Sequence, residues 1–179
     1  MPLVPIFDLD GTLIDSDAAL VAPFVALGIS LDDVTFGHVL EHECERLGIT
    51  VADYLSHYDV TMAMPFDGVE AVVAQLDRWA VCSNKQAGSA RAEIERLGWT
   101  PDVAMFADDF GGPKALGPVL DALGARSDDV LFVGDTEHDR ACAHAVGCRF
   151  GLACWNPRAS AVAGDLVLRR PHDVLAALG

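Results

Sequence analysis

Short apolar runs that end abruptly at a small or polar residue recur along this chain and constrain its fold more than any other feature. The clearest runs cover residues 4–8, 79–83, 103–108 and 130–135, and weaker ones cover 148–153 and 165–168. Between them, apolar residues recur at helical spacing over 68–77, 86–97, 113–123 and 138–146. Because strands alternate with helices, we expect an α/β fold in three layers, with a parallel sheet between two layers of helices.

One long stretch interrupts this alternation. Between residues 16 and 64 no segment has the pattern of a core strand, and apolar residues recur at helical spacing over 18–27, 34–47 and 51–58. A chain of 179 residues has room for one domain with a small insertion. We therefore predict a core domain made of residues 1–15 and 65–179 and a small, all-helical cap made of residues 16–64, inserted after the first strand.

Polar side chains end the apolar runs, where ligands of open parallel sheets bind. Asp8 ends the first run, and Asp10 points to the same side if the strand continues. Two carboxylates this close repel each other, which favours a cation between them. Gly11 follows, and a glycine allows the sharp turn in which backbone N–H groups face an anion. Carboxylates, a hard cation and an anion-binding turn are the parts that phosphoryl transfer needs.

A second acidic pair follows the run at 130–135. Asp135 ends that run, and Asp139 lies one helical turn later. Taken alone, the pair also fits a helix N-cap at Asp135 with Asp139 beside the helix dipole. Asp108 and Asp109 end another run, and we interpret them as part of a loop before the next turn.

Other candidates for anion binding are few. Ser83 could donate a hydrogen bond to a phosphoryl oxygen, although Ser83 or Asn84 could also cap the helix that follows. The chain contains two lysines, Lys85 and Lys114. Either ammonium group could contact a phosphate, and either could instead lie solvated on a helix surface.

Four ordered segments resemble the motifs of the haloacid dehalogenase-like hydrolase superfamily. They are Asp8-Leu9-Asp10-Gly11-Thr12-Leu13, Val81-Cys82-Ser83-Asn84, Lys114 after Gly111-Gly112-Pro113, and Val133-Gly134-Asp135-Thr136-Glu137-His138-Asp139. The resemblance runs from residue 5 to about 153 and implies a Rossmann-like core with a cap over the site, similar to phosphoglycolate-phosphatase-like members but with a shorter cap. One departure is that Ala115 follows the lysine, where the family often has proline.

The resemblance implies a Mg²⁺-dependent phosphomonoester hydrolase that works through an aspartyl phosphate. In that scheme Asp8 is the nucleophile, and Asp10 is the general acid and base. The phosphate-binding residues would be Gly11, Ser83, Asn84 and Lys114, with motif order favouring Lys114 over Lys85. The residues holding Mg²⁺ would be Asp8, Asp135, Asp139 and, through its backbone carbonyl, Asp10. Dehalogenases of the superfamily lack the second aspartate, so Asp10 favours phosphoryl transfer.

Several alternatives remain open from the sequence alone. A phosphomutase of the same fold would return the phosphoryl group to its substrate, and a non-catalytic module would bind Mg²⁺ without turnover. A phospho-accepting regulatory domain also uses clustered aspartates and a lysine, but the helical insertion and the Gly11-Thr12 pair argue against it. His38 and His42 have the spacing of zinc ligands on a helix, yet no third ligand follows, so we expect a polar helix face there.

The composition of the chain restricts the classes of partner that it can bind. The formal net charge of −15 argues against nucleic acid and anionic membranes, and no apolar run approaches the ~20 residues of a membrane span. Five scattered cysteines predict reduced thiols, and the N-terminus lacks a secretory pattern, so we expect a cytoplasmic protein. The resemblance implies a small phosphomonoester as the partner, and we expect a monomer or a homodimer. Between residues 16 and 65, eight acidic residues against Arg46 alone favour a substrate with a neutral or cationic remainder, such as a sugar or amino-alcohol phosphate.

Overall fold

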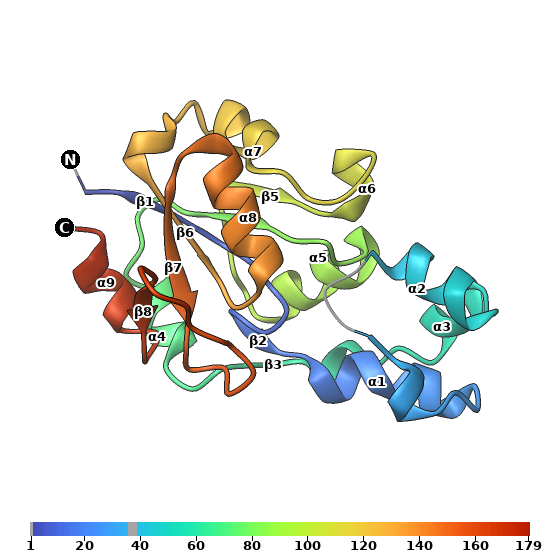
Figure 1. Cartoon of the computed structure of the whole chain (residues 1–179). Coiled ribbons are helices and arrows are strands. Elements are labelled where there is room, and N and C mark those ends of the chain that lie inside the picture. Colours follow the sequence, from blue (N-terminus) through green and yellow to red (C-terminus); the bar gives the residue numbers. More distant parts are fainter. Residues whose placement is uncertain (1, 36–38) are drawn as a thin grey trace.

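A six-stranded sheet forms the centre of the molecule (Figure 1). The structure, a computed structural model, describes residues 2–35 and 39–179. The strand order is β5-β4-β1-β6-β7-β8, and each neighbouring pair runs parallel. These strands are β1 (Val4–Phe7), β4 (Ala80–Cys82), β5 (Val103–Met105), β6 (Val130–Gly134), β7 (Arg149–Ala153) and β8 (Leu166–Leu168). The first strand of the chain therefore lies in the middle of the sheet, where the winding direction reverses.

Helices cover both faces of this sheet. One face packs on α4 (Val69–Val73), α5 (Ala87–Arg96) and α9 (Asp173–Ala177), and the other on α7 (Leu116–Leu123) and α8 (Glu137–Val146). Successive strand residues alternate between the two layers, so that Phe7 and Val133 face α4 and α5 while Ile6 and Phe132 face α7 and α8. Strands buried on both sides explain the unbroken apolar runs in the sequence. The predicted three-layer α/β fold is confirmed.

Several element ends differ from the sequence prediction. The run at 103–108 is a strand only to Met105, because the Phe106 N–H donates to the Asp109 carboxylate (2.9 Å) and α6 (Ala107–Phe110) begins there. The helix predicted from residue 113 starts at Leu116. The helix predicted over 68–77 ends at Val73, and β1 ends before Asp8.

The long stretch between the first strand and the rest of the sheet is helical, as predicted. It contains α1 (Asp17–Ala26), α2 (Leu40–Leu47) and α3 (Val51–Ser56), with 3₁₀ turns η1 (Leu31–Asp33) and η2 (Val60–Met62); a third turn, η3 (Ser127–Asp129), precedes β6. The helix predicted over 34–47 begins only at Leu40, and residues 36–38 lie outside the described part of the chain.

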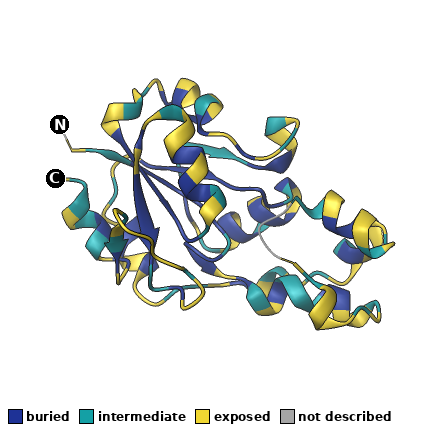
Figure 2. Cartoon of the chain, viewed as in Figure 1, coloured by how far each residue is buried: buried dark blue, intermediate teal, exposed yellow. Residues whose placement is uncertain are grey.

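These inserted helices have a small core of their own. Phe24, Cys44 and Tyr54 are buried together, and the rings of Phe24 and Tyr54 are 4.7 Å apart. The inserted helices lie beside the sheet at its carboxyl end, next to α5, and their buried positions face inward (Figures 1 and 2). Two short strands, β2 (Ile14–Asp15) and β3 (Met64–Pro65), pair antiparallel where the insertion begins and ends.

The state of the cysteines and the character of the helices are two further features of the fold. All five cysteines carry free thiols, and four of them are buried: Cys44, Cys82, Cys142 and Cys148. Within residues 2–35 and 39–179, no helix combines the length and the apolar character needed to cross a membrane.

Candidate functional site

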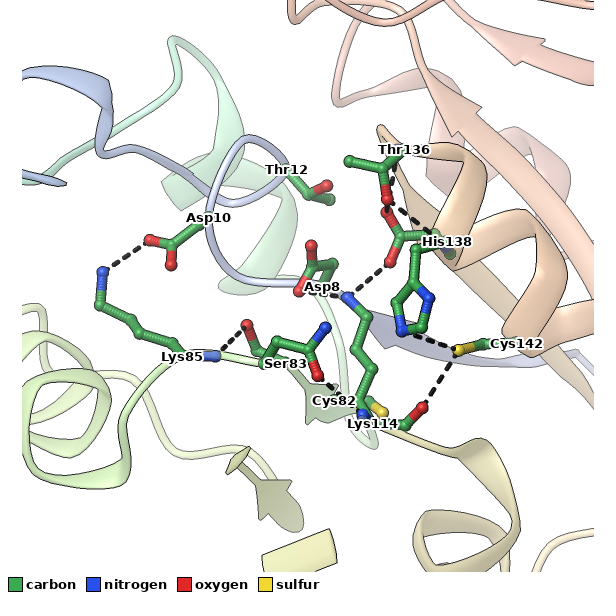
Figure 3. A network of polar contacts seen from close by, with 12 residues as sticks. Asp8, Asp10, Thr12, Cys82, Ser83, Lys85, Lys114, Thr136, His138 and Cys142 are labelled. Atoms are coloured by element: carbon green, nitrogen blue, oxygen red, sulfur yellow. Dashed lines mark hydrogen bonds and ion pairs between the residues drawn. The ribbon is translucent and has the colours of Figure 1, made fainter. Parts of the chain in front are cut away.

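Three strand-end loops, those after β1, β4 and β6, meet the segment before α7 at the carboxyl end of the sheet. They bring together residues that are far apart in sequence: Asp8, Asp10, Ser83, Asn84, Lys85, Lys114 and Asp135. With α1, α2 and α3 they enclose a cavity of about 120 Å³. Ligands of doubly wound sheets bind at this position, next to the central strand. Figure 3 shows the polar network at the floor of the cavity.

Lys114 lies at the centre of this floor (Figure 3). Its Nζ is 2.8 Å from Oδ1 of Asp8 and 2.6 Å from Oδ1 of Asp139. Burial opposes the positive charge, but the carboxylates of Asp139 and Asp8 outweigh it and raise the pKa of Lys114. The sequence placed Lys114 at the start of a helix; it lies in the preceding loop instead, where its N–H donates to Oδ1 of Asn84 (2.7 Å).

Three buried carboxylates lie close together beside this lysine. Asp8, Asp135 and Asp139 each offer an oxygen within 4.8 Å of the others, the one group of this kind among the described residues. Burial, assisted by the neighbouring carboxylates, raises the pKa of Asp8 from 3.8 to about 7 and that of Asp135 from 3.8 to about 6. Three carboxylates and one ammonium group leave two negative charges uncompensated when all are ionised, which is the charge that one divalent cation balances.

Two residues that the sequence prediction missed fix the orientation of Asp135. Thr12 donates its hydroxyl to Oδ1 of Asp135 (3.1 Å), and Asn156 donates its amide to Oδ2 (2.9 Å). Asn156 also donates to the carbonyl of Gly11 (2.9 Å), which connects the loop after β7 to the loop after β1. Asn156 follows the apolar run at 148–153, so the rule that polar residues at strand ends gather at one site would have identified it.

The turn at Gly11 depends on the absence of a side chain. Its φ is +78°, a region that favours glycine, and a Cβ there would lie 2.5 Å from Oδ2 of Asp135. The Gly11 N–H donates to the carbonyl of Ile14 (2.8 Å). In this conformation the Gly11 amide therefore serves the turn, and the residue contributes by letting the backbone approach Asp135 closely.

Lys85 is buried and paired, which contradicts the alternative of a solvated lysine. Its Nζ is 2.6 Å from Oδ1 of Asp10 and 3.2 Å from Oε1 of Glu93. The hydroxyl of Tyr58, just after α3, donates to the same oxygen of Glu93. Burial raises the pKa of Glu93 to about 7, whereas Asp10 and Glu93 overcome the burial of Lys85 and raise its pKa. Each lysine therefore pairs with a different aspartate of the first loop: Lys114 with Asp8, and Lys85 with Asp10.

The alternative that Ser83 or Asn84 caps the following helix is wrong. Gln86, not Ser83 or Asn84, is the N-cap of α5, and its side chain accepts from the N–H of Ser89 (2.9 Å). Both Ser83 and Asn84 line the cavity. The side chain of Ser83 accepts from the Lys85 N–H (3.3 Å), which leaves its own proton to donate.

The cap of α8 is Thr136, not Asp135. Thr136 and Asp139 form a reciprocal capping box, in which Oδ2 of Asp139 accepts from the N–H (2.9 Å) and the hydroxyl (2.6 Å) of Thr136. Asp139 therefore uses one oxygen for the cap and the other for Lys114, while Asp135 is directed into the site.

The remaining acidic candidates do not join the site. Asp108 and Asp109 belong to the short helix α6, not to a loop, and neither lines the cavity. The proposed histidine pair includes His38, which lies outside the described residues, so that interpretation stays a prediction.

Comparison with known proteins finds similarity over most of this chain. The family model described as haloacid dehalogenase-like hydrolase matches residues 26–153. A phosphoglycolate phosphatase of Xanthomonas campestris pv. campestris is 28% identical over 191 residues, which cover 88% of this chain and 85% of that protein. A phosphoglycolate phosphatase of Rhodospirillum rubrum is 30% identical over 189 residues, covering 82% and 77%.

Among solved structures, a protein of Clostridium acetobutylicum described as a predicted phosphatase superimposes with a TM-score of 0.77 at 17% identity, over 99% of this chain and 98% of that one. At this identity the match establishes the shared fold. Because the family model spans most of its length, this chain belongs to the haloacid dehalogenase-like hydrolase family.

Proposed function

We propose that this hydrolase is a Mg²⁺-dependent phosphatase that cleaves small phosphomonoesters through a phosphorylated Asp8. The observation that carries the proposal is the meeting of Asp8, Lys114 and Asp135 at the floor of one cavity, with Asp10 at its side. The phosphoglycolate phosphatases to which the chain is similar support phosphomonoesters as the substrate class.

Asp8 is the nucleophile in the proposed reaction. One of its oxygens attacks phosphorus, a new O–P bond forms, and the bond between phosphorus and the leaving oxygen breaks. Asp10 gives its proton to that leaving oxygen, which departs as an alcohol. Asp10 then takes a proton from water as the water oxygen bonds to phosphorus and the bond between phosphorus and the Asp8 oxygen breaks. Phosphate leaves, Asp8 is again a carboxylate, and Asp10 is again protonated. Lys114 and the hydroxyl of Ser83 stabilise the charge on the phosphoryl oxygens.

The donor set suits Mg²⁺. Carboxylate oxygens are the ligands that this ion prefers, and the uncompensated charge of the acidic group matches a divalent cation. We propose Asp8 and Asp135 as side-chain ligands, with the backbone carbonyl of Asp10 as a third. Asp139, whose two oxygens already serve Lys114 and Thr136, acts by holding Lys114. When bound, Mg²⁺ would offset the repulsion between the carboxylates and the incoming phosphate.

Residues 16–64 are proposed to act as a cap over this floor. Leu20, Phe24, Tyr54 and Tyr58 of this segment line the cavity opposite Asp8. A wall of this kind excludes water from the reacting atoms and contacts the part of the substrate that leaves.

The proposal is tested by measuring phosphate released from a panel of phosphomonoesters with Mg²⁺ and with a chelator. We expect release with Mg²⁺, loss of release with chelator, and recovery when Mg²⁺ is restored. Transfer of the phosphoryl group between organic molecules without free phosphate would favour a phosphomutase. Mg²⁺ binding without either reaction would favour a non-catalytic module, and full activity in chelator would contradict the role of the metal.

The stability of the metal-free protein is expected to depend on pH. Asp8, Asp135 and Glu93 have raised pKa values in the folded state, so the folded protein keeps protons that the unfolded chain has lost. Their stabilising effect is complete near pH 4 and is lost as the pH rises through about 6 to 7. We expect the Tm in chelator to fall by roughly 3–10 °C between pH 5.5 and 8.

Added Mg²⁺ should reverse this fall, because it binds the ionised carboxylates. The Tm increase caused by Mg²⁺ should therefore be larger at pH 8 than at pH 5.5, as thermal unfolding can measure. Asp135→Asn, which removes one of the carboxylates, should weaken both the pH dependence and the Mg²⁺ effect. A Tm in chelator that rises over this pH range would contradict the assignment.

Lys85 is expected to act by positioning Asp10. Replacement by methionine removes the 2.6 Å contact, so Asp10 loses its fixed orientation toward the leaving oxygen. We expect Lys85→Met to lower kcat by about 10- to 100-fold with little change in KM. Lys85→Arg, which keeps the charge, should retain more of the activity. Equal loss in both variants with an unchanged Tm would argue against positioning through charge.

A further inference from the structure

The wall of the cavity that faces the reacting floor is mainly apolar. It is formed by Leu20 and Phe24 of α1, Val34, Leu40, and the tyrosines at positions 54 and 58. Tyr54 and Tyr58 stack with their ring centroids 6.0 Å apart. This wall lines the same cavity as Asp8 and Lys114, so the part of a phosphomonoester beyond its phosphoryl group would contact it. The cavity volume of about 120 Å³ favours a small group there.

The tyrosine hydroxyls in this wall are already used. The hydroxyl of Tyr54 donates to the carbonyl of Leu20 (2.9 Å), and that of Tyr58 donates to Glu93. Each donated proton is therefore unavailable to a substrate. On the core side, the N–H (2.9 Å) and the hydroxyl (3.4 Å) of Ser89 both donate to Oε1 of Gln86.

Glu43 is the acidic group of the wall, and its oxygens are saturated. Oε1 accepts from the N–H of Thr35 (2.7 Å) and from Arg46 (2.7 Å), and Oε2 accepts from the hydroxyl of Thr35 (2.9 Å) and from Arg46 (2.9 Å). The hydrogen bonds from Arg46 lower the pKa of Glu43 to about 2, so it is ionised and occupied. Neither Glu43 nor its arginine is poised to contact a hydroxyl, an ammonium group or a carboxylate of a substrate.

The positively charged groups along the cavity are also paired. Lys114 and Lys85 each lie between two carboxylates, and Arg158 pairs with Asp17. The ring of His138 lies beside a cysteine thiol one turn further along α8, with Nε2 3.7 Å from the sulfur. A second anionic group on a substrate would thus meet paired cations and several carboxylates in the described part of this cavity.

We infer that the site selects phosphomonoesters whose leaving alcohol is small, uncharged and mainly apolar. The inference rests on the phosphomonoester hydrolysis proposed above and sets this chain apart from phosphoglycolate as a substrate. It also disfavours sugar phosphates, because an uncharged polyol would lose its hydration against the apolar wall, where both tyrosine protons are already donated. An apolar alcohol loses no hydrogen bonds there and gains from burial.

The test compares kcat/KM for butyl phosphate and phenyl phosphate with that for phosphoglycolate and glucose 6-phosphate, all with Mg²⁺. We expect the apolar esters to be preferred by about tenfold or more. Equal or better turnover of phosphoglycolate or glucose 6-phosphate would overturn the inference and leave phosphatase activity standing. Release from none of the four esters, with activity on none of a wider panel, would remove the proposed function together with it.

A variant with a positive charge in the wall provides a second test of the substrate preference. Leu20→Arg places an unpaired cation in the wall and should shift the preference toward phosphoglycolate by about tenfold or more. Val25→Arg adds the same charge on the exposed side of the same helix, outside the cavity, and should leave the preference unchanged.

If Leu20→Arg does not fold, product inhibition of the unmodified protein answers the same question. Butanol should then inhibit at lower concentration than glycolate. Stronger inhibition by glycolate would overturn the inference.

Discussion

Replacement of Asp8 by asparagine is expected to reduce phosphate release by about 10⁴-fold or more. An amide nitrogen or oxygen cannot replace the carboxylate oxygen that forms the bond to phosphorus. In the unmodified protein, acid quenching during turnover should trap the phosphoryl group on the chain, and this labelled protein should be absent from Asp8→Asn. Asp8→Ala serves as a second variant, since alanine cannot revert to aspartate by deamidation.

Loss of folding would not explain this result. Asp8 is one of three clustered carboxylates, and removing one negative charge relieves repulsion in the metal-free protein. The Tm of Asp8→Asn in chelator should therefore equal or exceed that of the unmodified protein at pH 8. Normal turnover by a verified Asp8→Asn sample would exclude Asp8 as the nucleophile.

Replacement of Lys114 by methionine is expected to damage both stability and activity. Methionine fills a similar volume but leaves Asp8 and Asp139 buried without their cation, a loss that costs about 3–5 kcal/mol when one partner of a buried ion pair is removed. Because Lys114 is also proposed to contact the phosphoryl group, kcat should fall by about 10²- to 10³-fold. Chemical unfolding and phosphate release measure the two effects separately.

The effect of Mg²⁺ on stability tests the role of Lys114 in the folded protein separately from its role in activity. Without the lysine, the acidic group carries an additional uncompensated charge, so Mg²⁺ should stabilise Lys114→Met more than it stabilises the unmodified protein. As a control, Arg126→Met removes an exposed ion pair with Asp128 and should change neither stability nor kcat measurably. A Lys114→Met protein with full stability in chelator would contradict the buried-pair description.

The reliable part of the sequence prediction came from patterns that the sheet itself imposes. Alternating apolar runs and helical stretches define the layers, and Asp8 and Asp135 follow parallel strands whose ends must meet. Element ends were less predictable because they depend on contacts from elsewhere in the chain. The start of α7 is an example, since Lys114 is held in the preceding loop by Asn84, thirty residues earlier.

Side-chain contacts between distant segments of the site could not be predicted from the sequence for the same reason. Nothing local to Lys85 indicates that Glu93 and Tyr58 will surround it, because those contacts depend on how α5 packs against the inserted segment. Asn156 is different, since its place after a strand was visible and only its partner, Asp135, was not. The sequence thus identified the groups proposed to do chemistry more readily than the groups that contact and orient them.

The short pairing of β2 with β3 has a consequence for how such a chain can diversify. Ile14 lies opposite Pro65 and Asp15 opposite Met64, so the chain leaves the sheet and returns to it at neighbouring points. A segment anchored in this way can be exchanged for one of another length or composition without shifting the register of any strand in the large sheet. Given the proposed role of residues 16–64 as a cap, we expect a graft at residues 15 and 64 to transfer substrate preference and to keep the reaction chemistry, provided that the hydrogen bond from Tyr58 to Glu93 is retained.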